Sequence, residues 1–264
     1  GAAPALPRSR FLKIDKMIAF DNVRHTLKII VCTCPSNTLG AGLVYDKAEK
    51  NIDSIVEVIS RTCNPVSAKK YADVAFVSNM SRKDFTDKVR KVKKYIVAGD
   101  VIQVVLSQRF SARTDVPPLQ LYRALRFLNP SPYTFFLKIG KQTLVGSSPE
   151  VLVRLTDKHI ELRPIAGTRP RGKNAEEDFQ LAKELRDDEK ERAEHVMLVD
   201  LGRNDVGRVA KTGTVSVSEF MVIERYSHVM HLVSHIIGTL DDNYDAYDLI
   251  KAAFPAGTLT GAPK

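Results

Sequence analysis

The stretch TFFLKIGKQTLVGSSPEVLVRLTDKHIELRP, residues 134–164, contains four short apolar runs separated by turn residues. Short apolar runs bounded by Gly, Lys, Ser and Asp are typical of β-strands that are joined by tight turns. We therefore predict four strands that form an antiparallel meander, with the sequences TFFLKI, TLVGS, EVLVRLT and HIELRP.

The sequence on either side of this block mixes further strands with helices. Alternation of β-branched and polar residues predicts strands in four places, namely a hairpin over 17–32 and single strands over 101–110, 214–223 and 228–240. Helical spacing of apolar residues predicts five helices, over 47–61, 81–99, 117–130, 176–205 and 245–254. Because the strands come in blocks and do not alternate strictly with helices, we predict an α+β fold with large, mainly antiparallel β-sheets flanked by helices.

The ten residues RPIAGTRPRG, 163–172, directly follow the last strand of the opening block. Proline removes backbone donors and glycine adds conformational freedom, so we predict a loop here and no regular secondary structure. Three arginines in this segment favour an anionic ligand nearby.

Charge and composition limit the classes of partner. The 264 residues include 40 Lys and Arg against 31 Asp and Glu, a net charge of +9, which favours a small carboxylate or phosphate ligand, nucleic acid or a membrane surface. Because the basic residues are scattered among acidic ones, we favour a small anion and expect no nucleic acid or membrane partner. No apolar run is long enough to cross a bilayer and no signal peptide is apparent, so we expect a cytoplasmic protein.

Three cysteines, Cys32, Cys34 and Cys63, are too few to pair completely and lack the spacing of a zinc site. We expect them to be reduced thiols in the core or partly buried, as in a cytosolic protein.

Two carboxylates of the segment EKERAEH, Glu191 and Glu194, are three residues apart and therefore lie on one face of the predicted helix. Such like charges repel each other unless a cation lies between them, and oxygen ligands without a thiolate favour Mg²⁺. The alternative is a solvated helix face with ion pairs, for instance between Glu191 and His195.

Other polar residues allow two interpretations each. Glu150, in GSSPEVLV, stands at the entrance of a predicted strand, where a raised pKa would suit a general acid; the alternative is a turn glutamate in water. His228 and His231 are three apart in a predicted strand and so point to opposite faces, and each is a core or surface residue unless one faces a site. NPSPYTFF, 129–136, is either a structural turn or a binding loop.

Seven segments, taken in order, resemble the motifs of the chorismate-utilising enzymes, and most closely those of the anthranilate synthase component I branch. They span most of the chain from Ala98 to Lys264 and read AGDVIQVVLSQRF, NPSPYTFFL, GSSPEVLVR, RPIAGTRPRG, ERAEHVMLVDLGRNDVGRV, YSHVMHLVS and FPAGTLTGAPK. Each segment is a weak signal alone, whereas the ordered series is specific. The resemblance implies the layered α+β sandwich of that branch.

The resemblance also implies roles for single residues. Glu194 would be a ligand of Mg²⁺, with Glu191 close by and acting through water, and Glu150 would be the general acid. Gly167 and Thr168, next to Ala166, would contact chorismate, whose two carboxylates suit a cationic loop, a metal ion and backbone N–H groups. His231 would lie beside the substrate ring.

Two positions indicate which chemistry of this family applies. Relatives that add water to the ring carry a lysine base where this chain has Gln103, and ammonia needs no such base because its neutral form is already nucleophilic. Relatives that make aminodeoxychorismate carry lysine where this chain has Ala166. Both residues therefore favour the anthranilate branch.

The resemblance implies the large, chorismate-aminating subunit of anthranilate synthase, which converts chorismate and ammonia to anthranilate and pyruvate in tryptophan biosynthesis. A glutamine amidotransferase subunit, component II, would supply the ammonia. Alternatives within the family are aminodeoxychorismate synthase component I and isochorismate or salicylate synthase. An alternative of another class is a non-catalytic module that binds anions or nucleic acid.

The same comparison predicts the organisation of the chain and its regulation. We expect residues 1–72 to be the remainder of an N-terminal region and 73–264 to be a chorismate-binding catalytic domain without its C-terminal portion. Pro132, Tyr133 and Thr134 match the segment that binds L-tryptophan as a feedback inhibitor, although Thr134 replaces the usual methionine.

Overall fold

The computed structural model describes residues 11–34, 40–62, 70–226 and 228–264, and the chain divides into two compact units, Gly1–Lys70 and Tyr71–Lys264. None of the helices formed by the described residues combines the length and the apolarity that a bilayer crossing requires. The assignment of 1–72 as an N-terminal remainder and 73–264 as a catalytic domain stays a prediction.

The first unit contains the predicted hairpin and the predicted helix. Strands β1 (Lys16–Asp21) and β2 (Thr26–Val31) pair antiparallel, and α1 covers Ala41–Ser60, so both predictions are confirmed. Lys16 Nζ donates a hydrogen bond to Asn51 Oδ1 of α1 at 2.8 Å.

The expectation of buried or partly buried thiols is wrong for the two cysteines that the structure describes. Cys32 and Cys34 are both exposed in the segment that follows β2. Cys63 lies outside the described residues.

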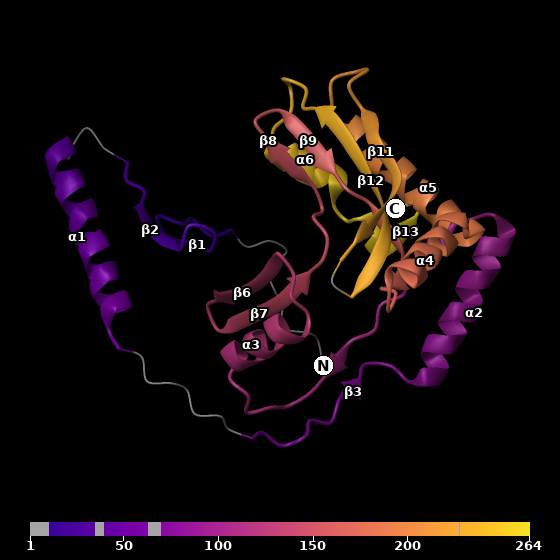
Figure 1. Ribbon diagram of the computed structural model, residues 1–264, viewed down its shortest axis with the longest axis horizontal. Coiled ribbons are helices and arrows are strands. Elements are labelled where there is room, and N and C mark those ends of the chain that lie inside the picture. The colour runs from indigo at the N-terminus through magenta and orange to yellow at the C-terminus, as the bar shows by residue number, and fades with distance from the viewer. Residues whose placement is uncertain (1–10, 35–39, 63–69, 227) are drawn as a thin grey trace. The chain divides into compact units, whose positions relative to one another are not determined.

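The second unit is built around an antiparallel sheet of five strands (Figure 1). Its order is β10–β12–β9–β8, and β11 pairs with the other edge of β12. The strands cover Arg154–Thr156 (β8), His159–Leu162 (β9), Ile165–Pro170 (β10), Ser216–Arg225 (β11) and Val229–Thr239 (β12). β12 is therefore the central strand, with three partners.

Helices α4 (Ala175–Asp187) and α5 (Glu189–Gly207) both pack on β10 and β12. The single helix predicted over 176–205 is wrong, because Asp188 between them has an extended backbone, with ψ at 111°. The Asp188 carboxylate accepts a hydrogen bond from the backbone N–H of Glu191 at 3.0 Å and so caps the start of α5.

Apolar side chains of the central strand face these helices and form the core. Met230, Leu232 and Ile236 of β12 are fully buried, as is Leu185 of α4. Burying each such side chain contributes about 1.5–3 kcal/mol to folding. Helix α6 (Ala246–Ala253) packs on α5 and extends this core. The α+β fold with a mainly antiparallel sheet flanked by helices is therefore confirmed.

Four further elements, two helices and two strands, agree with the sequence predictions. Helix α2 (Arg82–Ala98) begins after Ser81, whose side chain accepts from the Asp84 N–H, and ends at Gly99 in the left-handed region. Helix α3 (Pro118–Leu128) packs against the hairpin of β6 (Tyr133–Ile139) and β7 (Gln142–Ser148).

The expected four-stranded meander is wrong. β6 and β7 form a two-stranded sheet of their own, whereas β8 and β9 belong to the five-stranded sheet. The chain between Ser148 and Arg154 has no ladder partner, so EVLVRLT forms a strand only from Arg154 onward.

The strand expected over 101–110 is likewise reduced to two short pieces, because each finds only a two-residue partner. β4 (Gln103–Val104) pairs with β13 (Gly261–Ala262), which follows the short helix α7 (Gly257–Thr260). The other pair joins β3 and β5, Val77–Ser78 and Phe110–Ser111.

The loop predicted over 163–172 is also wrong, because Ile165–Pro170 forms β10 against β12. Ile165 and Ala166 pair in one register, and Arg169 and Pro170 pair in a shifted one. Gly167, between them, has φ +64°, so the freedom seen in the sequence produces a local irregularity within a strand. Pro170 lies at the last pair of the ladder, where a missing N–H disrupts little.

We predict that Gly261→Ala strongly destabilises the protein. Gly261 has φ +118°, and a Cβ there would stand 2.1 Å from the Gln103 carbonyl oxygen. Alanine should lower the free energy of unfolding by roughly 3–5 kcal/mol, measured by urea denaturation. Gly213→Ala is the control, because φ is +80° and no atom lies within 4 Å of the new Cβ; its cost should be about 1–2 kcal/mol. Equal costs would contradict the proposed contact.

Candidate active site

A cavity of about 580 Å³ lies where β10, β12, α5 and the chain before β6 meet. The structure brings together there most of the residues that the sequence singled out, namely Gln103, Pro132, Glu150, Ala166, Gly167, Thr168, Glu194 and His231. Glu191, Tyr133 and Thr134 are not among its lining residues.

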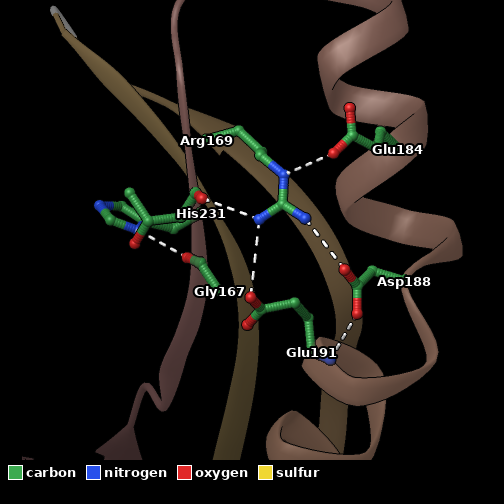
Figure 2. A network of polar contacts seen from close by, with 7 residues as sticks. Gly167, Arg169, Glu184, Asp188, Glu191 and His231 are labelled. Atoms are coloured by element: carbon green, nitrogen blue, oxygen red, sulfur yellow. Dashed lines mark hydrogen bonds and ion pairs between the residues drawn. The ribbon is translucent and has the colours of Figure 1, made fainter.

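The irregular part of β10 holds the His231 side chain (Figure 2). Nδ1 of His231 lies 2.9 Å from the Gly167 carbonyl oxygen and 3.1 Å from Thr168 Oγ1. A carbonyl oxygen only accepts hydrogen bonds, so Nδ1 carries a proton, and a neutral imidazole in this arrangement has its lone pair on Nε2. The Tyr226 ring meets the imidazole edge to face at 5.5 Å, which further fixes its orientation. His231 can therefore act as a base through Nε2.

Glu150 follows β7 and does not open a strand, because β8 begins only at Arg154. Burial raises the pKa of its carboxyl to about 7, and a backbone hydrogen bond from Ile165 partly opposes this shift. A carboxyl with this pKa holds a proton for a large fraction of the time at neutral pH, as a general acid requires. Glu150 is thus a residue of the bend after β7 whose carboxyl is partly shielded from water.

The side chain of Gln103 in β4 contacts the carboxylate of Glu194 in α5. Its Nε2 donates to Glu194 Oε1 at 3.3 Å, and a carboxylate accepts only, so the amide orientation is fixed. Gln103 Oε1 then points elsewhere, is buried and has no partner among the described residues. An unpaired buried acceptor of this kind costs about 1–3 kcal/mol unless a donor from a ligand meets it.

Glu191 lies outside the cavity and belongs to an ion network centred on Arg169 (Figure 2). Its Oε1 lies 3.5 Å from Arg169 Nη1, and its side chain is only 20% exposed. The alternative ion pair with His195 is not formed: His195 is fully buried, and its Nε2 lies 2.7 Å from Ser234 Oγ. Burial lowers the pKa of His195 to about 4, so this imidazole is neutral.

The carboxylates of Glu194 and Glu191 have the chemistry that Mg²⁺ requires. Glu194 lines the cavity, and Glu191 Oε2 lies so close to Gly167 that a Cβ on this glycine would stand 3.2 Å from it. Within the described residues, no group of three or more His, Cys, Asp or Glu is placed to hold a metal. One or two carboxylates completed by water and substrate oxygens are the usual protein ligands of Mg²⁺, so the oxygen donors of these two residues suit this ion in kind.

Both histidines of HVMHLVS line the cavity, so the expectation that they point to opposite faces is wrong. The reason is that His228 precedes β12, which begins at Val229, and strand alternation does not apply to it. Sequence reasoning also missed Tyr226 as a lining residue, although YSHVMHLVS was one of the recognised segments. It also missed Arg169, because the segment 163–172 contains three arginines and the sequence does not show which of them contacts other site residues.

The segment NPSPYTFF has both structural and cavity-lining parts. Pro132 lines the cavity, whereas the Tyr133 hydroxyl accepts from Arg154 Nη2 at 3.1 Å. Thr134 Oγ1 donates to the Ser131 carbonyl at 2.9 Å, which stabilises the turn before β6. A role of these residues in binding tryptophan stays a prediction.

The comparisons with known proteins agree with the fold. The profile of the family described as chorismate binding enzyme matches residues 2–264. The chain is 51% identical to anthranilate synthase component 1 of Aquifex aeolicus (strain VF5) over 95% of its length, and 51% identical to that of Acinetobacter calcoaceticus over 98%. A crystal structure of anthranilate synthase component I from Streptococcus pneumoniae TIGR4 superimposes with a TM-score of 0.83, at 35% identity over 95% of this chain.

The chain belongs to the chorismate binding enzyme family, and the resemblance that its motifs indicated is confirmed. It spans 51% and 52% of the lengths of the two relatives and 55% of the crystallised chain.

We predict that Glu150→Gln changes how stability depends on pH. The folded state keeps the Glu150 proton up to about pH 7, whereas the unfolded chain loses it near 4.5, so this group lowers wild-type stability as pH rises across that window. Glutamine cannot titrate. The free energy of unfolding of the variant minus that of the wild type should therefore rise between about pH 4.5 and 7 and stay level above it. Urea denaturation at several pH values measures this difference, and a pH-independent value would show that Glu150 is not buried as described.

Proposed function

We propose that the intact protein containing this chain is the chorismate-aminating subunit of an anthranilate synthase. One observation carries the proposal: a single cavity presents the Glu150 carboxyl, with a pKa of about 7, the free Nε2 of His231 and the unpaired Gln103 oxygen beside Glu194. This combination provides an acid, a base and an acceptor for an N–H group. The relatives named above support the choice of substrate.

Chorismate would bind against the irregular part of β10. The Thr168 hydroxyl and the backbone at Gly167 line the cavity and are free of bulky side chains, so a carboxylate can approach them closely. Glu194, with Glu191 acting through water, would hold Mg²⁺, which offsets the negative charge of a substrate carboxylate when bound. Leu198 of α5 supplies an apolar wall for the ring.

In the first reaction step, ammonia forms a bond to ring carbon C2, and the hydroxyl at C4 leaves as water with the proton of Glu150. Expelling hydroxide without a proton is unfavourable, and a general acid typically contributes about 10²–10⁴-fold to such a step. The Gln103 oxygen would accept a hydrogen bond from ammonia and so orient its lone pair toward C2. A glutamine here supplies no base to activate water, which favours amination over hydration.

In the second step, a base removes the proton from C2 and the bond between C3 and the enolpyruvyl oxygen breaks, which makes the ring aromatic. The released enolpyruvate takes up a proton at its methylene carbon and becomes pyruvate. His231 Nε2 is suited to take this proton because Nδ1 already donates to the Gly167 carbonyl. Ala166 carries no amine that could compete with ammonia for the ring.

Further parts of the proposal concern partners. A glutamine amidotransferase subunit would supply the ammonia, L-tryptophan would inhibit through the segment of Pro132, Tyr133 and Thr134, and the protein would work in the cytoplasm.

Incubation with chorismate, Mg²⁺ and ammonium, followed by chromatography of the products, tests the proposed reaction. Anthranilate and pyruvate are the expected products. Aminodeoxychorismate, isochorismate or salicylate would overturn the assignment in favour of another branch of the family, and binding of DNA or RNA without any product would favour the non-catalytic module.

We predict that Glu150→Gln lowers kcat by about 10²–10⁴-fold while chorismate binding largely persists, because the amide cannot donate the proton that the leaving hydroxyl needs. In the wild type, kcat should fall as pH rises through about 7, where Glu150 loses its proton. The matched control is Glu161→Gln on β9, a glutamate that pairs with Arg154 outside this cavity and should leave kcat unchanged. Unchanged turnover in Glu150→Gln would remove the general acid from the mechanism.

A further inference from the structure

Arg169 is the one cation shown at the centre of the network in Figure 2, and it joins β10 to both covering helices. Its Nε donates to Glu184 Oε1 of α4 at 3.1 Å, and its Nη2 donates to Asp188 Oδ2 at 3.0 Å. Its Nη1 donates to the carbonyl of Thr168 at 3.0 Å and lies 3.5 Å from Glu191 Oε1. The guanidinium therefore contacts three carboxylates and the backbone of the cavity-lining turn at once.

The geometry of this cluster gives Glu191 a different position from its two neighbours. The contacts of Glu184 and Asp188 are direct hydrogen bonds, whereas the contact of Glu191 is a longer ion pair. A Cβ on Gly167 would stand 3.2 Å from the second oxygen of Glu191 and 2.8 Å from Leu185 Cδ1, so a side chain there would crowd both residues. Glu191 is thus held beside Gly167, a residue that lines the cavity.

Charge explains why this position depends on Arg169. Three carboxylates meet one guanidinium that is only 18% exposed, so the cluster keeps an excess of negative charge even when Arg169 is present. Without the guanidinium, the carboxylates of Asp188 and Glu191 would repel each other within one helical turn. Glu191 sits on the first turn of α5 and would then rotate toward water, away from Gly167.

We propose that Arg169 is a positioning residue that holds the Glu191 carboxylate at the divalent-cation site and thereby sets the affinity for the cation. This inference rests on the proposed function only in assuming that Glu191 and Glu194 serve a cation. Arg169 is not among the residues that line the cavity. Its planar fork meets several oxygens in fixed directions, which the single ammonium of a lysine cannot reproduce.

A purely structural arginine on the same strand end provides the matched control. Arg171 binds Asp178 of α4 through Nε at 2.6 Å and Nη2 at 3.3 Å, and its Nη1 donates to the Tyr226 carbonyl. None of these contacts reaches α5 or Glu191. Arg171→Met therefore removes a comparable link between β10 and α4 and leaves the Glu191 carboxylate in place.

The experiment measures cation affinity directly, with Mn²⁺ as the probe, by electron paramagnetic resonance of the free ion, and with Mg²⁺ as competitor. The intact protein and the variants Arg169→Met, Arg169→Lys, Arg171→Met and Glu191→Gln are compared after circular dichroism has checked that each is folded. Loss of an outer partner of a metal ligand typically weakens metal affinity by about 10–100-fold. Because Glu191 would reach the cation through water, it is itself such an outer partner. We expect this loss in Glu191→Gln, a loss of at most the same size in Arg169→Met, a smaller loss in Arg169→Lys, and a change below about twofold in Arg171→Met.

A double-mutant cycle then tests whether Arg169 acts through Glu191. In a Glu191→Gln background, Arg169→Met should weaken Mn²⁺ binding little further. Additive losses, an unchanged affinity in Arg169→Met, an equal loss in Arg171→Met, or a wild type that binds no Mn²⁺ would each overturn the inference.

The failure of this inference and that of the proposed function can be told apart by product analysis of the same samples. Anthranilate formation by the wild type with an unchanged Mn²⁺ affinity in Arg169→Met would overturn the role of Arg169 alone. Weakened Mn²⁺ binding in Arg169→Met, in a protein that makes another chorismate-derived product, would support the role of Arg169 and overturn the anthranilate assignment.

Discussion

The irregular pairing of β10 with β12 at Gly167 is the constraint on which the geometry of the cavity depends. The ladder is regular at Ile165 and Ala166, shifts register, and resumes at Arg169, and the left-handed backbone of Gly167 accommodates the shift. The Gly167 carbonyl thereby meets His231, and the missing Cβ leaves room for Glu191. The irregularity at Gly167 thus positions His231 through the Gly167 carbonyl and makes room for the Glu191 carboxylate beside the Gly167 Cα.

The buried core stabilises the protein despite this irregularity, because it holds the surrounding elements rigidly. Fully buried apolar residues of β12 pack on α4 and α5, and the neutral His195 bonds to Ser234 within the same layer. Ser234 Oγ in turn accepts from the backbone N–H of Met221, a residue of β11 with φ +53°. Since α5 carries both Glu191 and Glu194, its tight packing on the central strand fixes where these carboxylates can reach.

Local sequence signals predicted the elements whose physics is local. Ser81 and Gly99 marked the ends of α2, and alternation marked β12, because caps and side-chain periodicity act within a few residues. The segment 163–172 could not be predicted in the same way: its prolines and glycine argue for a loop, and only the partner strand, more than sixty residues later, turns it into β10. The break at Asp188 was missed for a similar reason, since an aspartate within a charged helical tract reads equally well as an exposed helical residue.

The candidate residues show the same division. The resemblance to a known family selected Glu150, Gln103, Gly167 and His231, which are far apart in sequence and meet in one cavity. It could not reveal that the Gln103 oxygen has no partner among the described residues or that His228 also lines the cavity. Nor could it reveal that Arg169 forms an ion pair with Glu191. These facts depend on side-chain directions, which the tertiary fold sets.

The most direct test is a crystal structure of the intact protein soaked with chorismate and Mg²⁺. We expect the ligand in the cavity, with a carboxylate near the Thr168 hydroxyl, the metal on Glu194, and the C4 oxygen within hydrogen-bonding distance of Glu150. Electron density for the ligand elsewhere, or the Glu194 and Glu191 carboxylates turned to solvent with no ion between them and the ligand, would contradict this expectation.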